Sequence, residues 1–164
     1  MLGLGLWYVG FVLFINAIWM FGKMSNKAVI PMNIFVAVVQ VAGVMAVIFT
    51  GKETSEFYNA ALTLLFAFTY LYVAATQIWS LDGRGLGWYC LPVAILAIPA
   101  GIQSLSTPGL ALLWFMWSTL WFMFFLLLGL GKNIGRQTAW WTLVNSIVTF
   151  VGAYFTLTEM WPWW

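Results

Sequence analysis

Six apolar stretches, each close to 20 residues long, fill this chain and leave only short polar loops between them. A helix of about 20 apolar residues is long enough to cross the hydrocarbon core of a bilayer. Within that core every backbone N–H and C=O needs a partner, which only helices and closed barrels supply. Hydrophobic residues make up 64% of the chain and charged residues 6%, whereas a soluble domain carries roughly 25% charged residues. We therefore predict an all-α integral membrane protein with six transmembrane helices.

The loops set the bounds of the expected helices, because Gly, Ser, Asn and Asp gather in them. The expected spans are 2–21, 28–50, 58–79, 88–104, 109–130 and 138–160. The fourth is the shortest, and Pro92 and Pro99 interrupt it. No room remains for an extramembrane domain, so residues 1–164 are expected to form a single transmembrane domain. We expect no removable signal peptide, because the first residues lack a basic leader and a small-residue cleavage site.

The basic residues are distributed unevenly over the loops. The first, third and fifth loops carry Lys23, Lys27, Arg84, Lys132 and Arg136. The second loop has only Lys52, beside two glutamates. By the positive-inside rule the odd loops face the cytoplasm, so both termini are predicted to lie outside. Two halves of three helices then run in opposite directions, which is the condition for an inverted three-plus-three repeat.

No Asp, Glu, Lys or Arg lies inside the six expected spans, since Glu159 falls at the end of the sixth and the others fall in loops. Coupled carriers place such groups within the membrane, and enzymes need bases, nucleophile pairs or metal clusters. The chain has no histidine and one cysteine, Cys90, which we interpret as a small apolar core residue. We therefore expect no enzyme activity, no cofactor, no metal site and no nucleic-acid partner, and a coupled pump is disfavoured.

Three tryptophans form one stripe on the fifth expected helix. At about 100° per residue, Trp114, Trp117 and Trp121 fall within about 60° of one another. Trp121 lies about 18 Å inside the segment, near the middle of a hydrocarbon core about 30 Å thick. Its indole N–H needs a partner there, from another helix, from water or from a passing polar solute. The stripe is thus either packing core or pore lining.

Neutral polar residues are also aligned on the expected helices. The sixth helix carries Thr138, Thr142, Asn145, Thr149 and Thr156 within about 60° of one direction. Each threonine could instead donate to a carbonyl of its own helix. The first helix offers Leu2, Leu6, Val9 and Leu13, with Asn16 on the same face. Asn33 and Gln40 share a face of the second helix, and Phe68 and Tyr72 share a face of the third.

Helix depth brings several of these residues to one level. Counting about 1.5 Å per residue, Leu13, Phe68, Tyr72, Trp121 and Asn145 fall within roughly 6 Å of the midplane. Aromatic rings make a narrow slot that excludes hydrated ions, and a few hydrogen-bonding groups replace part of a solute's water. The combination favours a small, planar, neutral and polar solute.

The sequence resembles the AmiS/UreI family of urea and short-chain amide channels over most of its length. The resemblance is carried by residues 1–4, Tyr8-Val9-Gly10, Met32-Asn33, the run 65–74, Trp88-Tyr89, the three tryptophans of the stripe and Leu130-Gly131-Lys132. It implies a pore in each protomer, a ring of six protomers with lipid at its centre, and a place in the inner membrane of a bacterium. It also implies that the pore is lined by Leu2, Leu6, Val9, Leu13, Phe68, Tyr72, Trp114, Trp117, Trp121 and Asn145. Asn16, Asn33, Thr142 and Thr149 are expected as secondary polar lining.

Two departures from the family shape the functional expectation. Acid-gated members have long external loops rich in histidine, whereas here those loops are only 51–56 and 105–108, and we expect no acid gating. Asn145 stands where such a member has glutamate, and an amide can pair reciprocally with acetamide. We therefore expect a passive channel for urea or short amides that accepts amides at least as well as urea. The competing interpretation is a non-conducting structural subunit.

Overall fold

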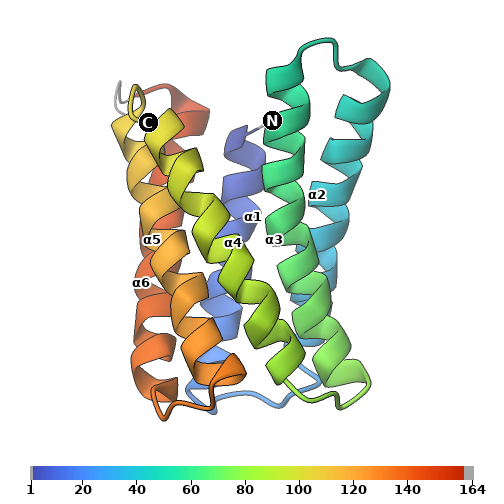
Figure 1. Ribbon diagram of the computed structural model, residues 1–164, viewed down its shortest axis with the longest axis vertical. Coiled ribbons are helices and arrows are strands. Elements are labelled where there is room, and N and C mark those ends of the chain that lie inside the picture. The colour runs from blue at the N-terminus through green and yellow to red at the C-terminus, as the bar shows by residue number, and fades with distance from the viewer. Residues whose placement is uncertain (1, 161–164) are drawn as a thin grey trace.

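The computed structural model describes residues 2–160, although nothing is described of the Leu2 side chain. Six long α-helices span this part of the chain (Figure 1). They are α1 (Leu2–Met20), α2 (Ile30–Thr50), α3 (Thr54–Ile78), α4 (Arg84–Gln103), α5 (Pro108–Phe124) and α6 (Gly135–Thr158). A short π-helical segment, η1 (Phe125–Gly129), continues α5. All six helices are long and apolar enough to cross a membrane, which confirms the expected fold class.

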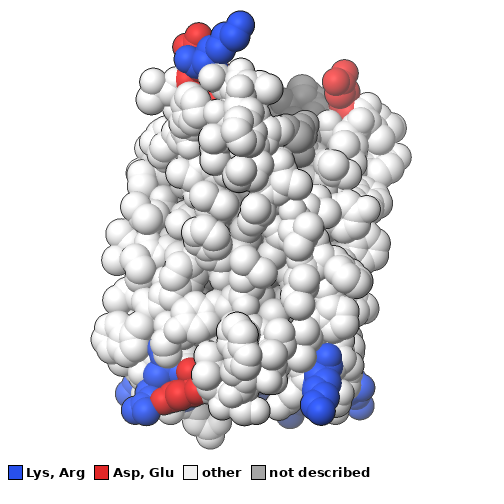
Figure 2. Space-filling model, turned by 90° about the vertical axis from the view of Figure 1, so that its right-hand side faces the viewer, with Lys and Arg blue, Asp and Glu red and all other residues white. Residues whose placement is uncertain are grey.

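Charged side chains gather at the two ends of the bundle and leave an uncharged band between them (Figure 2). This distribution is the one expected of a protein whose middle lies in hydrocarbon. Tryptophans near helix ends are exposed, as Trp79 (68%), Trp88 (52%) and Trp140 (54%) show. Amphipathic rings at these positions are typical of the membrane interface. The side on which the termini lie and the inverted repeat stay predictions.

The helices pack mainly in three pairs, α1 with α6, α2 with α3, and α4 with α5 (Figure 1). Small residues allow the closest approach between α1 and α6. A Cβ at Gly10 would lie 2.7 Å from Cδ1 of Phe150, and the Ser146 hydroxyl donates to the Gly10 carbonyl at 2.8 Å. Small residues let membrane helices approach closely, and serine hydroxyls link them. This contact directs one face of α6 against α1.

Three expected helix starts were wrong, because α3, α4 and α6 begin three or four residues earlier than expected, α6 at Gly135. α3 begins at Thr54 because Glu53 and Glu56 form a capping box, in which Glu56 accepts hydrogen bonds from the backbone N–H groups of Lys52 and Glu53. Residues expected in a loop therefore belong to the first turn of α3. α4 begins at Arg84, four residues before the expected start, and both of its prolines lie inside the helix.

The end of the fifth span also differs from the expected continuous helix. The chain widens into η1, where the Leu130 N–H donates to the Phe125 carbonyl at 3.1 Å. The backbone of Gly129 in this segment lies very close to the backbone of Gly87 in α4. A Cβ added at Gly87 would lie only 2.1 Å from the Gly129 nitrogen. π-Helical turns are rare and often lie at functional sites. Here η1 brings the end of the fifth span against α4.

Candidate pore

Two cavities lie one after the other inside the bundle. The larger, here called the vestibule, has a volume of about 650 Å³, and the smaller, the inner chamber, has about 50 Å³. The vestibule reaches the end of the bundle where α3 begins, since Ser55 and Glu56 line it. The inner chamber is lined by Leu13, Asn16, Phe66, Thr69, Tyr70, Val73, Leu86, Cys90, Trp117, Leu120, Trp121, Phe124 and Thr142. A cavity that holds one buried water needs a volume of about 10–15 Å³. The volume of the inner chamber is several times larger, so the chamber has room for one small solute.

Phe66 and Trp117 line both cavities and form the partition between them. Their rings meet edge to face, with centroids 4.9 Å apart and an interplanar angle of 85°. Phe66 also contacts Trp121 at 4.7 Å and Trp114 at 5.7 Å. Trp114 and Trp117 pack edge to face in turn, at 5.3 Å. The tryptophan stripe therefore packs around one phenylalanine of α3, and the same cluster separates the two cavities.

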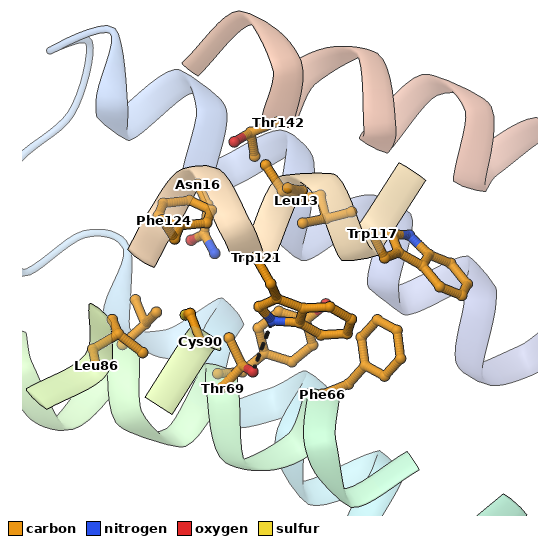
Figure 3. Close-up of a pocket in the computed structure, with 13 residues that line it drawn as sticks. Leu13, Asn16, Phe66, Thr69, Leu86, Cys90, Trp117, Trp121, Phe124 and Thr142 are labelled. Atoms are coloured by element: carbon orange, nitrogen blue, oxygen red, sulfur yellow. Dashed lines mark hydrogen bonds between the residues drawn. The ribbon is translucent and has the colours of Figure 1, made fainter. Parts of the chain in front are cut away.

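Threonines on neighbouring helices hold the indole N–H groups at the partition. Trp121 donates to the Thr69 hydroxyl at 3.2 Å, shown as a dashed line in Figure 3. Thr69 in turn donates to the Leu65 carbonyl at 2.7 Å. Trp117 donates to the Thr149 hydroxyl, also at 3.2 Å. Because both N–H groups have partners within the protein, the indoles offer the cavities their apolar ring surfaces.

Asn16 supplies an amide to the largely apolar wall of the inner chamber (Figure 3). It forms a reciprocal pair with Asn33, in which Asn33 donates to Asn16 at 2.8 Å and Asn16 donates back at 3.2 Å. Asn33 also donates to the Val29 carbonyl at 2.9 Å and is fully buried. Asn33 thus fixes the orientation of Asn16 without lining either cavity itself.

Most of the residues expected to line a pore do line these cavities. Leu6, Val9 and Trp114 line the vestibule, Leu13, Asn16, Trp121 and Thr142 line the inner chamber, and Trp117 lines both. The Leu2 side chain lies outside the described part of the chain. α1, α3 and α5 supply most of these side chains, so residues far apart in the sequence meet in one passage.

Phe68 and Tyr72 line neither cavity, contrary to expectation. Phe68 is 47% exposed on the outside of the bundle, and Tyr72 lies against the start of α4, where its hydroxyl would be 2.2 Å from a Cβ at Gly85. Their places at the cavities are taken by Phe66 and Tyr70, two residues earlier on α3. Both aromatic pairs have a spacing of four residues, so the spacing cannot decide which pair faces inward.

Asn145 also lies outside both cavities, although it is fully buried. Its Nδ2 donates to the Trp141 carbonyl at 2.8 Å. Its Oδ1 has no partner among the described residues. The polar stripe of α6 faces the contact with α1, and Thr138, Thr142 and Thr156 donate to carbonyls of their own helix. Within this stripe only Thr142 lines a cavity and only Thr149 binds an indole among the described contacts.

Sequence reasoning missed several residues that line the cavities. Phe66, Tyr70 and Cys90 are the clearest cases at the inner chamber, and Gln40 is one at the vestibule. A lone cysteine has no partner motif, so nothing in the sequence distinguishes Cys90 from a core residue. Gln40 did share a helix face with Asn33, which was the available signal.

A bundle of six membrane-length helices that encloses largely apolar cavities with aromatic rings and a few polar side chains has the architecture of a membrane channel. The chain belongs to the AmiS/UreI family: the model of that transporter family matches residues 1–160. A putative amidate substrates transporter protein of Mycolicibacterium smegmatis is 35% identical over 97% of this chain and 78% of the relative. The acid-activated urea channel of Helicobacter pylori strain J99 is 31% identical over 98% of this chain and 100% of the relative.

Solved structures of the Helicobacter pylori urea channel are similar in fold. Its crystal structure matches with a TM-score of 0.89 at 32% identity, covering 98% of this chain and 99% of the other. A cryoEM structure in the closed state matches with a TM-score of 0.88, again at 32% identity, covering 98% of this chain and 100% of the other.

Proposed function

We propose that this chain is a passive channel for urea and short-chain aliphatic amides. The observation that supports it best is the series of two cavities that lie on either side of the partition of Phe66 and Trp117. The relatives named for urea and for amidate substrates agree with a small, neutral, polar solute. The alternative is a non-conducting structural subunit, in which the same cluster is only packing.

The chemistry of the walls suits such a solute. A planar amide or urea molecule slides between ring surfaces that a hydrated ion cannot enter without losing its water. Asn16 offers hydrogen bonds within the inner chamber, while the satisfied indoles stay apolar. None of the residues that line the inner chamber is acidic or basic. We therefore infer downhill flux without a coupled ion or proton.

Assembly and location form part of the proposal. We infer six protomers in a ring with lipid at its centre, in the inner membrane of a bacterium, with the odd loops in the cytoplasm. Large apolar side chains cover the outside of the protomer, among them Phe35 (63%) and Phe49 (78%) on α2. Such faces need lipid or another protomer against them. Residues 1–164 are proposed to act as a single channel domain.

The proposed channel function can be tested by measuring solute flux with and without a reagent that blocks the inner chamber. Proteoliposomes containing the protein should admit urea and acetamide faster than protein-free liposomes in a shrink-swell assay. Uncharged mercuric chloride should remove most of the added flux, because mercury bound at Cys90 fills part of a chamber of about 50 Å³. Cys90→Ala should resist the block, measured as a fraction of its own flux. A protein that adds no solute flux is the structural subunit of the alternative.

We also expect flux to depend little on pH between 5 and 7.5. The chain has no histidine, and ordinary carboxyl groups, with pKa values near 4, stay ionised throughout this interval. Urea uptake into proteoliposomes at the two pH values should agree within about twofold, since no histidine is present to change charge in this interval. Protein-free liposomes measured at the same two pH values provide the control. A steep rise on acidification would show gating by some other group.

A further inference from the structure

A buried carboxamide without a hydrogen-bond partner lies in the wall of the vestibule. Gln40 is 6% exposed and lines the vestibule from α2. Its Oε1 is buried, and no described residue donates a hydrogen bond to it. A buried amide in this state is costly, and in native proteins it usually indicates a missing partner. The question is what that partner is.

The other polar side chains of the vestibule either have partners or, like Ser55 and Asn59, are exposed. Thr63 donates to the Asn59 carbonyl at 2.9 Å, and Gln103 donates to the Tyr58 hydroxyl at 3.1 Å. The charged residue of the vestibule, Glu56, lies in the first turn of α3 and accepts two backbone hydrogen bonds. Gln40 therefore differs from all of them in being both buried and without a partner among the described residues.

Helix geometry places Gln40 close to the level of the partition. It lies ten residues from Thr50, the end of α2, which corresponds to about 15 Å along the helix. Trp117 lies nine residues after the start of α5, or about 14 Å, and Phe66 lies twelve residues after the start of α3, or about 18 Å. These three helix ends lie at the same end of the bundle (Figure 1). Gln40 is thus at the floor of the vestibule.

We propose that Gln40 is a recognition residue that binds the carboxamide face of the solute before the solute passes the partition. Its Oε1 accepts from a solute N–H, and its Nε2 donates to the solute carbonyl. The pair Asn16–Asn33 shows the same reciprocal geometry within this chain, with distances of 2.8 and 3.2 Å. This inference rests on the proposed function, because it assigns the selectivity of the same passage.

The reciprocal pair imposes a strict requirement on the solute. The N–H must lie on the same side of the C–N bond as the carbonyl oxygen, as it does in urea and in every primary amide. Secondary amides adopt the trans form, in which the N–H points away from that oxygen. Propionamide and N-methylacetamide are isomers of nearly equal size, and only propionamide can form both hydrogen bonds with Gln40.

The test compares the flux of these two isomers through proteoliposomes after subtraction of flux into protein-free liposomes. Wild-type protein should favour propionamide by about fivefold, the value of one net hydrogen bond. Gln40→Met, which keeps the length and loses the amide, should abolish most of this preference. Gln77→Met is the matched control, because Gln77 lines neither cavity and donates to the Thr76 hydroxyl; its preference should equal that of wild type.

The outcomes separate this proposal from the channel function. A wild-type channel that conducts both isomers equally overturns the role of Gln40 without any variant. If Gln40→Met shows the same preference as wild type, the role of Gln40 is overturned as well. The channel function still stands in either case, provided that wild-type protein conducts urea. If wild-type protein adds no flux of urea, acetamide or propionamide, the proposed function itself fails.

Discussion

Replacing Phe66 with alanine should open the partition to larger solutes. The Phe66 ring contacts the rings of Trp114, Trp117 and Trp121, so its loss joins the vestibule to the inner chamber. Forcing an extra methylene into a filled space costs about 1–3 kcal/mol, and each 1.4 kcal/mol corresponds to about tenfold in rate. Protein-dependent flux of butyramide relative to acetamide should therefore rise roughly tenfold in Phe66→Ala.

Phe68→Ala supplies the matched control for this experiment. The same side chain is removed two residues away, where the ring is 47% exposed and lines neither cavity. Its butyramide-to-acetamide ratio should equal that of wild type in the same shrink-swell assay. A ratio that changes in Phe68→Ala and not in Phe66→Ala would show that solute passes along the other face of α3. Monodisperse elution of both variants in size-exclusion chromatography establishes that they are folded.

The second large effect is expected from Gly87→Ala. The added Cβ would lie 2.1 Å from the Gly129 nitrogen and 2.6 Å from the Gly129 Cα, both of which are backbone atoms. Backbone atoms cannot rotate away as a side chain can, so α4 and η1 must separate. Overpacking costs about 1–3 kcal/mol and occasionally more, and we expect a loss of at least this size in the stability of the detergent-solubilised protein, measured as a lower Tm.

Gly5→Ala makes the same chemical change in α1 at a position with open space, since nothing lies within 4 Å of the added Cβ. In a helix, alanine is favoured over glycine by about 1 kcal/mol. The Tm of Gly5→Ala should therefore match or exceed that of wild type. If Gly87→Ala melts at the temperature of Gly5→Ala, the close contact between Gly87 and Gly129 does not limit the stability of the fold.

The number and type of the helices could be predicted from the sequence because the bilayer requires them. Long apolar stretches between polar loops have few solutions in hydrocarbon, and each helix is visible in its own residues. Helix ends were harder. The start of α3 depends on the capping box of Glu53 and Glu56, and η1 depends on the contact of Gly87 with Gly129.

Part of the candidate pore could also be predicted, because a stripe along one helix is a local pattern. Trp114, Trp117 and Trp121 share a face whatever that face meets, and they do lie at the cavities. For Phe66 and Phe68 the local pattern was ambiguous. Each begins an aromatic pair four residues apart, and the rotation of α3 against α5 decides which pair faces inward.

The sequence by itself determined that this chain crosses a membrane with six helices and that uncharged aromatic and amide side chains lie near the middle of these helices. It could do so because hydrophobicity and helical periodicity are properties of neighbouring residues. Only the tertiary structure decided that Asn145 is directed away from the cavities while Gln40 lines the vestibule. The physical reason is that the direction of a buried side chain depends on how its helix is rotated against its neighbours, as in the close contact of α6 with α1 at Gly10.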